Sequence, residues 1–294
     1  MGNSCNHLKF IRSSKNKKIV KKNKIYYCQF NIGDNLEGYL ITHIIYNKIY
    51  ILTKGINKYV GKCIKKKYRG EYELEIIKKN NSNLLPIFEY YIELELYDFI
   101  IYKHIDGKDI YDTFIDNIPI REKEVRPLFW QMLKCINHCQ ELGYLHLDIK
   151  PENFIATPIK HELNGKTKYR LTLIDFGYCI PNVLDKIMMS DYRGTNGYMA
   201  PEIFMKFVTS KTDLWSLGCV IYVMLTGKFP FHKSKVQFLQ DIYSSEHYNG
   251  LLKNIQHVSE DLQELIIKML KPDQDERISI EELMTHRYFN KTVI

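Results

Sequence analysis

The sequence predicts an α+β fold in which short β-rich segments come first and helical segments follow. From Tyr26 onward, apolar β-rich runs are broken by glycine and asparagine, which is typical of an antiparallel meander, and these runs are residues 27–32, 39–45, 49–53 and 59–64. Residues 122–142 carry apolar side chains at helical spacing, and residues 208–226 are apolar enough for a buried helix. With 294 residues, the chain can bury a large core around these segments.

Positive charge is concentrated before the first β-rich run. Eight of the 42 lysines and arginines lie in residues 9–24, where there is no carboxylate, and the other 34 balance the 34 acidic residues. These eight are Lys9, Arg12, Lys15, Lys17, Lys18, Lys21, Lys22 and Lys24. The sequence therefore predicts a basic N-terminal tail over residues 1–24 with an anionic partner, and it argues against a nucleic-acid-binding face on the body of the chain.

The first six residues resemble an N-myristoylation signal. Gly2 follows the initiator methionine and Cys5 is a candidate for palmitoylation, although Asn6 stands where Ser or Thr is usual. An acyl chain and the cations of the tail together predict peripheral membrane contact, and the alternative is an unmodified, solvated basic arm.

The cysteines and the hydropathy indicate a compartment. The seven cysteines are odd in number and scattered without CxxC spacing, which indicates a reducing compartment with neither disulfides nor zinc. No run approaches the roughly 18 apolar residues of a membrane span. We therefore expect an intracellular protein, either cytoplasmic or membrane-associated through its N-terminus.

Residues 144–154, with the sequence YLHLDIKPENF, place three functional side chains at fixed offsets in one loop. Asp148 supplies a proton acceptor, Lys150 a cation for a transferring oxyanion, and Asn153 an oxygen ligand for a hard metal ion. Pro151 restricts the backbone between Lys150 and Asn153. An ordinary polar surface loop is the alternative, and the motifs that follow weaken it.

Further motifs follow in a fixed order: DFG at residues 175–177, GTNGYMAPE at 194–202 and DLWSLG at 213–218. In this order they resemble the eukaryotic protein kinase superfamily, with a match from about Tyr59 to the C-terminus. The resemblance implies the two-lobed α+β protein kinase fold, a small antiparallel β lobe plus a larger, mainly helical lobe. The kinase domain would then span residues 25–294, with an N-lobe over 25–105, a hinge at 103–107 and a C-lobe over 108–294.

The same resemblance implies a serine/threonine protein kinase that binds ATP and Mg²⁺ in the cleft between the lobes. Asp148 would orient and deprotonate the hydroxyl of a protein substrate, and Lys150 would neutralise charge on the phosphates. Asn153 and Asp175 would hold the metal. Lys150 together with Thr195 resembles the serine/threonine branch, and we expect a monomer.

A lysine of the β-rich region is expected to contact the α and β phosphates of ATP. Residues 62–65 resemble the family motif V-A-I-K with Cys63 in the place of the small alanine, which assigns this role to Lys65 and leaves Lys62 and Lys66 as the next candidates. The run Cys-Ile-Lys-Lys is also similar to the motif that names the FIKK kinases of apicomplexan parasites, in which phenylalanine stands at the place of Cys63.

The family's helix glutamate, which pairs with this lysine, is best matched by Glu73. Ile76 and Ile77 fall at i+3 and i+4 from it, as a helix packed on a core requires. Glu71 and Glu75 stay open as alternatives.

The glycine-rich loop of the family is degraded in this chain. Counting back about 22 residues from Lys65 reaches residues 43–48, HIIYNK, which contain no glycine. A second alignment places the loop at residues 33–40, where Gly33 and Gly38 flank an asparagine, but it requires an extra strand. We prefer the first alignment, because an extra strand in a meander reverses the direction in which Lys65 enters the cleft.

Residues 99–107 align with the last strand of the small lobe and the hinge. Tyr102 becomes the gatekeeper, and its bulk should close the rear pocket. Lys103 and Ile105 would offer backbone groups to adenine, and Asp109 would face the ribose.

Leu147 stands where most of the family carries an arginine that binds a phosphorylated activation loop. Phosphorylation of Ser190, Tyr192 or Thr195 should therefore matter little for activity. The spelling His-Leu-Asp is the same in the FIKK group.

Two charged residues are expected to be structural. Residues 208–226 resemble the family's buried helix that holds the catalytic loop, which implies this role for Asp213. Arg277 resembles the family's late arginine, which implies that it pairs with Glu202 of the A-P-E motif.

Two alternatives come from other functional classes. The missing glycines and Leu147 favour a membrane-tethered pseudokinase that acts as an interaction module. The Asp…Asn and metal-Asp pattern is shared with small-molecule phosphotransferases of the aminoglycoside-kinase type, although Lys150 and the A-P-E motif are not expected there. Because the residues that carry the chemistry are intact, the sequence favours a protein kinase.

Overall fold

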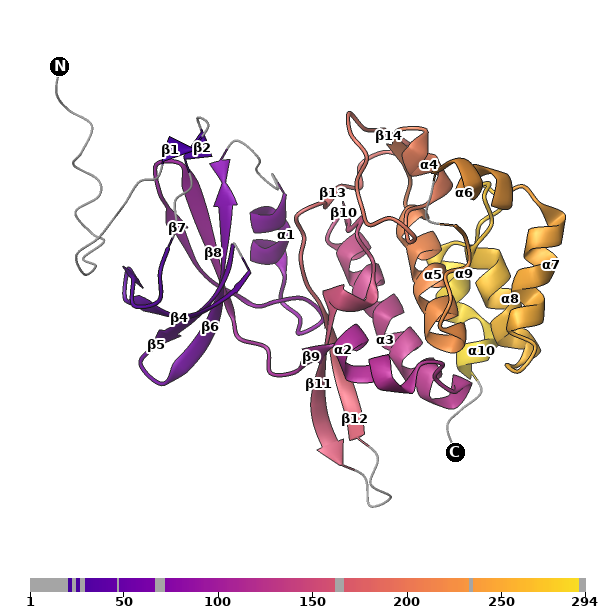
Figure 1. The fold of residues 1–294 in the computed structure, drawn as a ribbon, viewed down its shortest axis with the longest axis horizontal. Helices are drawn as coiled ribbons and strands as arrows, with labels where there is room; N and C mark the ends of the chain where they lie inside the picture. The colour runs from indigo at the N-terminus through magenta and orange to yellow at the C-terminus, as the bar shows by residue number, and fades with distance from the viewer. Residues whose placement is uncertain are drawn as a thin grey trace. The chain divides into compact units, whose positions relative to one another are not determined.

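The computed structural model describes residues 21–22, 25–26, 30–46, 48–66, 72–161, 167–232 and 235–290. The chain divides into two compact units (Figure 1). The first contains residues 1–69 and 87–104, and the second contains residues 70–86 and 105–294. The candidate acylation sites Gly2 and Cys5, with most of the basic tail, lie outside the described residues.

A six-stranded antiparallel sheet forms the first unit, in the order β3-β4-β5-β6-β8-β7. Its strands are β3 (Asn35–Leu36), β4 (Tyr39–Tyr46), β5 (Ile49–Lys54), β6 (Asn57–Lys65), β7 (Phe88–Glu93) and β8 (Tyr97–Lys103). A separate two-stranded pair joins β1 (Lys21–Lys22) to β2 (Ile25–Tyr26). The pairing of β4 with β5 and of β5 with β6 confirms the meander predicted for residues 39–64.

Alternation of side chains along the strands builds the core of this unit. Tyr39 and Ile41 of β4 and Tyr50 and Leu52 of β5 are all at most 3% exposed and belong to one apolar cluster with Phe99 of β8. Because successive side chains point to opposite faces of a strand, one face of the sheet carries this core.

The strand predicted for residues 27–32 is wrong over its described part. Phe30 packs edge-on against Phe99, with ring centroids 4.8 Å apart, and no strand includes it. The N–H of Asn31 donates to the carboxylate of Asp34 at 3.0 Å, which closes a turn before β3. Phe30 therefore covers the core of the sheet from a turn. Residues 27–29 lie outside the described residues.

Helices dominate the second unit. The longest is α3 (Glu122–Glu141), which confirms the helix predicted for 122–142. The next is α5 (Thr212–Thr226), which begins four residues later than the helix predicted for 208–226, because Phe207–Val208 form a strand. Nearly every residue of α5 is buried, so it is the centre of this unit. The shorter helices are α1 (Glu73–Lys79), α2 (Ile110–Phe114), α4 (Pro201–Phe204), α6 (Lys235–Asp241), α7 (Ser245–Asn254), α8 (Glu260–Met269), α9 (Ile280–Thr285) and α10 (Arg287–Asn290), with 3₁₀ turns η3 (Ile115–Asn117) and η4 (Pro151–Asn153).

Small antiparallel sheets connect these helices in the order β12-β11-β9, β10-β13 and β14-β15. Their strands are β9 (Lys108–Asp109), β10 (Tyr144–Leu145), β11 (Phe154–His161), β12 (Thr167–Leu173), β13 (Ile180–Pro181), β14 (Ile187–Met188) and β15 (Phe207–Val208). β12 ends two residues before Asp175 of the DFG motif. The hairpin of β11 and β12 projects beyond α2 and α3 (Figure 1).

Residues 70–86 group with the helical unit, which differs from the predicted N-lobe over 25–105. The side-chain oxygen of Asn80 lies 3.0 Å from a histidine ring nitrogen of α3, and the carbonyl of Leu84 accepts a hydrogen bond of 2.9 Å from Leu173 of β12. These hydrogen bonds to residues far along the chain group this segment with the helical unit, although α1 comes soon after the sheet strand β6 in the sequence. Among the described residues, no helix is long and apolar enough to cross a membrane.

Candidate functional site

The loop that carries Asp148 is anchored to the central helix α5. Asp213, fully buried in α5, accepts backbone hydrogen bonds of 2.8 Å from both His146 and Leu147. Burial raises the pKa of the Asp213 carboxyl above its ordinary value, while the two N–H donors act in the opposite direction. The His146 ring packs edge-on against Phe176 at 5.0 Å. The structural role predicted for Asp213 is confirmed, and His146 serves packing and hydrogen bonding, with a ring nitrogen 3.1 Å from the Ile174 carbonyl.

Three polar side chains surround the carboxylate of Asp148, which is only 4% exposed. Thr195 donates its hydroxyl to Oδ1 at 2.6 Å, and the Lys150 Nζ lies 2.9 Å from Oδ2. The same Nζ lies 3.0 Å from the Thr195 hydroxyl oxygen, and the Asn153 Nδ2 donates to Oδ2 at 3.1 Å. The structure thus brings together Asp148, Lys150 and Asn153, and it fixes the orientation of the carboxylate through Thr195.

Thr195 belongs to this site although it lies 47 residues from Asp148 in the chain. The sequence indicates Thr195 only through its place in GTNGYMAPE and through the resemblance of Lys150 and Thr195 together to the serine/threonine branch. Gly194 allows Thr195 to approach Asp148. The φ of Gly194 is +107°, and a Cβ at this position would lie 2.7 Å from the carbonyl oxygen of Leu147. A residue without a side chain is therefore required where this segment crosses the loop.

Asn153 and Asp175 have the donor chemistry of a magnesium site. The Asn153 amide nitrogen donates to the backbone oxygen of Asp148 at 2.7 Å and to Oδ2 at 3.1 Å, so the amide oxygen is the atom left for a cation. The N–H of Ile174 donates to the Asn153 carbonyl at 2.8 Å, which holds the exposed Asp175 next to it in the fold. An amide and a carboxylate oxygen are hard ligands that suit Mg²⁺. The described residues contain no group of three or more His, Cys, Asp or Glu that could hold a metal by themselves.

Leu147 occupies an unusual backbone conformation in this loop. Its φ is +64° and its side chain is 2% exposed, so it is a buried apolar group. The position that the family fills with a phosphate-binding arginine therefore carries no cation.

A buried ion pair ties the GTNGYMAPE segment to the end of the chain. Nη1 and Nη2 of Arg277 lie 2.7 and 2.9 Å from the two carboxylate oxygens of Glu202, and both residues are 1% exposed. Other Arg277 donors bind the carbonyls of Lys271 and Lys211, and the Thr212 hydroxyl donates to Glu202 at 2.8 Å. The predicted pair is confirmed, and its remaining polar groups are satisfied.

The candidate phosphate-binding lysine, Lys65, is the last residue of β6. Buried Gly61 and Cys63 alternate along β6 with half-buried Lys62 and Ile64, and Cys63 packs in the core of the sheet. Since strand side chains alternate, Lys65 lies on the face of Cys63 and Lys62 lies on the other face. The role of Lys65 stays a prediction.

The three glutamates proposed to pair with this lysine differ in burial. Glu73, the first residue of α1, is 1% exposed, whereas Glu75 is exposed and forms an i,i+4 ion pair of 2.9 Å with Lys79. Glu71 lies outside the described residues. Burial favours Glu73, and its pairing stays a prediction.

The two candidate positions of the glycine-rich loop lie at different turns of the sheet. HIIYNK covers the end of β4 and the turn to β5, one strand before β6. The Gly33–Gly38 segment leads into the β3–β4 hairpin, with Asn35 opposite Leu40, so it is two hairpins away from β6. Both alignments of the loop therefore stay predictions.

The hinge candidates follow β8. Tyr102 is buried in β8, and the N–H of Lys103 is already donated to the carbonyl of Ile87 at 3.0 Å. The Lys103 carbonyl is then the backbone group of this residue that could bind adenine. Ile105 lies two residues beyond the end of β8. Asp109 uses its Oδ1 to accept from the N–H of Asp112 at 2.8 Å, which caps α2. Their nucleotide contacts stay predictions.

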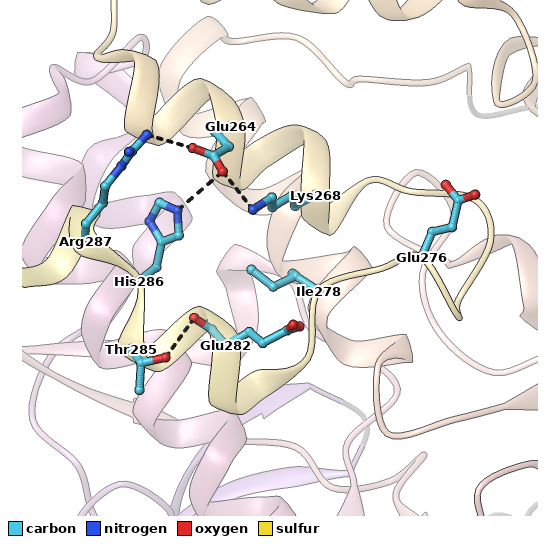
Figure 2. Close-up of a pocket in the computed structure, with 8 residues that line it drawn as sticks. All are labelled: Glu264, Lys268, Glu276, Ile278, Glu282, Thr285, His286 and Arg287. Carbon is cyan, nitrogen blue, oxygen red and sulfur yellow. Dashed lines mark hydrogen bonds and ion pairs between the residues drawn. The ribbon is translucent and has the colours of Figure 1, made fainter.

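A pocket of about 500 Å³ lies elsewhere in the second unit, between α8, α9 and α10 (Figure 2). Its charged groups satisfy one another: Glu264 lies 2.7 Å from Lys268, 3.0 Å from Arg287 and 3.8 Å from His286. No side chain of the Asp148 site lines it, so its size does not make it the reaction centre.

The chain is similar to several kinases. It is 34% identical to the serine/threonine-protein kinase cds1 of Schizosaccharomyces pombe over 65% of this chain and 41% of that protein. It is 29% identical to the serine/threonine-protein kinase SRK2E of Arabidopsis thaliana, over 66% and 52% of the two chains. It is 28% identical to the probable serine/threonine-protein kinase fhkD of Dictyostelium discoideum, over 75% and 30%.

The chain therefore spans between 30% and 52% of the length of these three relatives. The protein kinase domain family matches residues 35–289, which include the sheet of the first unit, the Asp148 site and the Glu202–Arg277 pair. With this match over most of its length, the chain belongs to the protein kinase domain family.

Proposed function

We propose that this chain is a protein serine/threonine kinase, which transfers the γ-phosphoryl group of ATP to a serine or threonine hydroxyl of a protein substrate. The observation that carries the proposal is the buried Asp148 carboxylate with Lys150, Asn153 and Thr195 within hydrogen-bonding distance. The names of the relatives support the same substrate class, although the chain matches only part of each.

Asp148 would orient the acceptor hydroxyl and accept its proton as the oxygen forms a bond to the γ-phosphorus and the bond to the bridging oxygen of ATP breaks. Lys150, at 2.9 Å from the same carboxylate, would supply positive charge beside the transferring group. Thr195 is a positioning residue, because it holds Oδ1 and leaves the other oxygen beside Lys150.

Asn153 and Asp175 would hold Mg²⁺ through their side-chain oxygens. When bound, ATP supplies the phosphoryl group and Mg²⁺ neutralises charge on its phosphates. Lys62 or Lys65 would add a second cation, and Lys103, Ile105 and Asp109 remain the candidates for nucleotide contacts.

Transfer of radiolabelled phosphate from ATP to a generic protein, followed by phosphoamino-acid analysis, tests this proposal. We expect phosphoserine and phosphothreonine from the wild type. We expect a loss of about 10²-fold or more in Asp148→Asn, which keeps the size of the side chain and removes the proton acceptor. Equal background incorporation by both proteins would favour a pseudokinase. Transfer only to small-molecule hydroxyls would favour the phosphotransferase alternative.

The catalytic loop motivates a proposal about regulation. His146-Leu147-Asp148 resembles the FIKK kinases, and the buried Leu147 cannot bind a phosphate as arginine would. Phosphatase treatment of active enzyme is therefore expected to leave its rate nearly unchanged. A large loss of activity, confirmed by intact mass to accompany loss of phosphate, contradicts this idea.

The basic tail motivates a proposal about localisation, because cations near an anionic membrane surface contribute about 1 kcal/mol each. We propose that the tail binds anionic lipid. Replacement of Lys17, Lys18, Lys21 and Lys22 by glutamine is expected to abolish co-sedimentation with phosphatidylserine vesicles without changing turnover of a soluble peptide. Unchanged sedimentation would instead support the alternative interpretation, in which the tail is a solvated basic arm.

A further inference from the structure

The chain between the DFG motif and Thr195 runs partly along the surface of the second unit. We call residues 182–195 the Thr195 segment. Its residues Val183, Leu184 and Met188 are 71%, 64% and 70% exposed. Side-chain packing therefore contributes little to the position of this part, and the place of Thr195 depends on contacts elsewhere.

The middle of the Thr195 segment is held by the chain that follows α4. β14 pairs with β15, and the N–H of Met189 donates to the carbonyl of Lys206 at 2.9 Å. The Tyr192 ring lies 6.1 Å from the ring of Phe204, the last residue of α4. Tyr192 is three residues before Thr195.

The chain beyond Thr195 is fixed to the central helix α5. Tyr198 is 7% exposed, and its N–H donates to the carbonyl of Thr195 at 3.1 Å. The carbonyl of Tyr198 accepts from the Ser216 hydroxyl of α5 at 2.8 Å. Thr195 is therefore anchored on its C-terminal side, and its remaining freedom of movement lies on the N-terminal side.

Arg193 supplies a hydrogen bond on that side. Its Nη1 donates to the carbonyl of Tyr178 at 3.1 Å, which joins two positions 15 residues apart in the chain. A hydrogen bond from a charged donor is stronger than one between neutral groups. This bond closes the exposed part of the Thr195 segment into a loop with a fixed end.

The acceptor of this bond lies in a well-fixed part of the unit. The N–H of Cys179 donates to the carbonyl of Phe176 at 3.1 Å, which closes a turn at Tyr178, and Cys179 is 1% exposed. Directly after it, β13 pairs with β10, the strand that leads into the catalytic loop. Arg193 therefore ties the Thr195 segment to the DFG motif and, through β10, to the loop that carries Asp148.

The two residues after Arg193 approach the site in succession. Gly194 passes the carbonyl of Leu147 so closely that a Cβ would not fit. Thr195 then donates its hydroxyl to Asp148 at 2.6 Å. A displacement of about 1 Å at such a contact can lower a rate about 10²-fold. Arg193 is thus placed to control a contact of the site that it does not itself make.

The acceptor that Arg193 uses needs no modification. Leu147 carries no charge, so a phosphate on the Thr195 segment finds no arginine at that place in the catalytic loop. The guanidinium of Arg193 binds a backbone carbonyl instead, and every residue carries such an acceptor. The segment is then held in the unphosphorylated protein.

We propose that Arg193 is a positioning residue, which holds Thr195 against Asp148 by binding the Tyr178 carbonyl and makes phosphorylation of the segment unnecessary for activity. This rests on the kinase activity proposed above. The alternative is a segment that depends on phosphorylation, in which Arg193 is an ordinary surface arginine.

The test uses phosphatase-treated protein whose intact mass shows no phosphate. In Arg193→Ala, kcat for a soluble acceptor peptide is expected to fall about tenfold or more with KM for ATP unchanged, because only the contact of Thr195 is disturbed. Arg193→Lys keeps a charged donor and is expected to recover about a third or more of the wild-type kcat. The matched control Arg170→Ala removes an exposed arginine of β12 and is expected to keep the wild-type kcat.

A second readout is independent of catalysis. Residues 189–198 begin and end on N–H groups that are hydrogen-bonded in the structure, those of Met189 and Tyr198. Hydrogen exchange of a peptide that spans these residues is expected to be about tenfold faster in Arg193→Ala than in the wild type, with the midpoint of urea unfolding unchanged.

These two readouts separate the bond from the reaction. If the wild type transfers no phosphate but Arg193→Ala speeds this exchange, the proposed function fails while the role of Arg193 in holding the segment stands. A wild-type kcat in Arg193→Ala, a lysine variant no more active than the alanine variant, or unchanged exchange over residues 189–198 would each overturn the proposal.

Discussion

Replacing Lys65 by alanine is expected to lower phosphotransfer by about 10²-fold or more, whereas Lys62→Ala stays within a few-fold of the wild type. The two lysines lie on opposite faces of β6, with Lys65 on the face of the buried Cys63. Cations that stabilise the transferring phosphates act through position, so we expect the lysine of the V-A-I-K resemblance to supply this charge.

Initial rates at saturating and limiting ATP measure this difference. Lys58→Ala is the matched control, because Lys58 is an exposed lysine of the same strand that no motif assigns to the phosphates. An active Lys65→Ala beside an inactive Lys62→Ala would show that the V-A-I-K match is wrong. Circular dichroism of each variant excludes loss of fold as the cause.

Arg277→Met is expected to destabilise the second unit by about 3–5 kcal/mol. The substitution leaves the carboxylate of Glu202 buried at 1% exposure without its bidentate partner, and an uncompensated buried charge is costly. Since domains are stable by only about 5–15 kcal/mol, the midpoint of urea unfolding should fall strongly.

A double-mutant cycle separates the pair from the packing. Glu202→Leu with Arg277→Met removes both charges, and we expect the double variant to unfold at higher urea than Arg277→Met alone. Additive effects of the two substitutions would mean that the ion pair itself contributes nothing. Arg121→Met, which breaks an exposed i,i+3 pair with Glu124, should shift the midpoint little.

Most of the second unit follows from local signals in the sequence. Helical periodicity identified α3 and the apolar run identified α5, because a long element repeats its pattern often enough to be read. Asp148, Lys150 and Asn153 are within six residues of one another, so their convergence in one loop needs little more than the chain itself. The Glu202–Arg277 pair could be expected only because a resemblance linked two distant motifs.

The tertiary structure decided what depends on distant contacts. Thr195 reaches Asp148 across 47 residues because Gly194 allows the segment to pass the Leu147 carbonyl at close range. Residues 70–86 join the helical unit through hydrogen bonds to α3 and β12. No local sequence pattern predicts these hydrogen bonds.

The sequence by itself determined the kinase motifs, their order and the chemistry they carry, since these are properties of residue type and spacing. Which face of β6 each lysine occupies was decided only by the sheet. Side chains alternate between the two faces of any strand, whatever motif it carries. Which face is buried depends on the residues that pack against it. Phe99 and its neighbours cover Cys63, and Lys62 therefore lies on the other face.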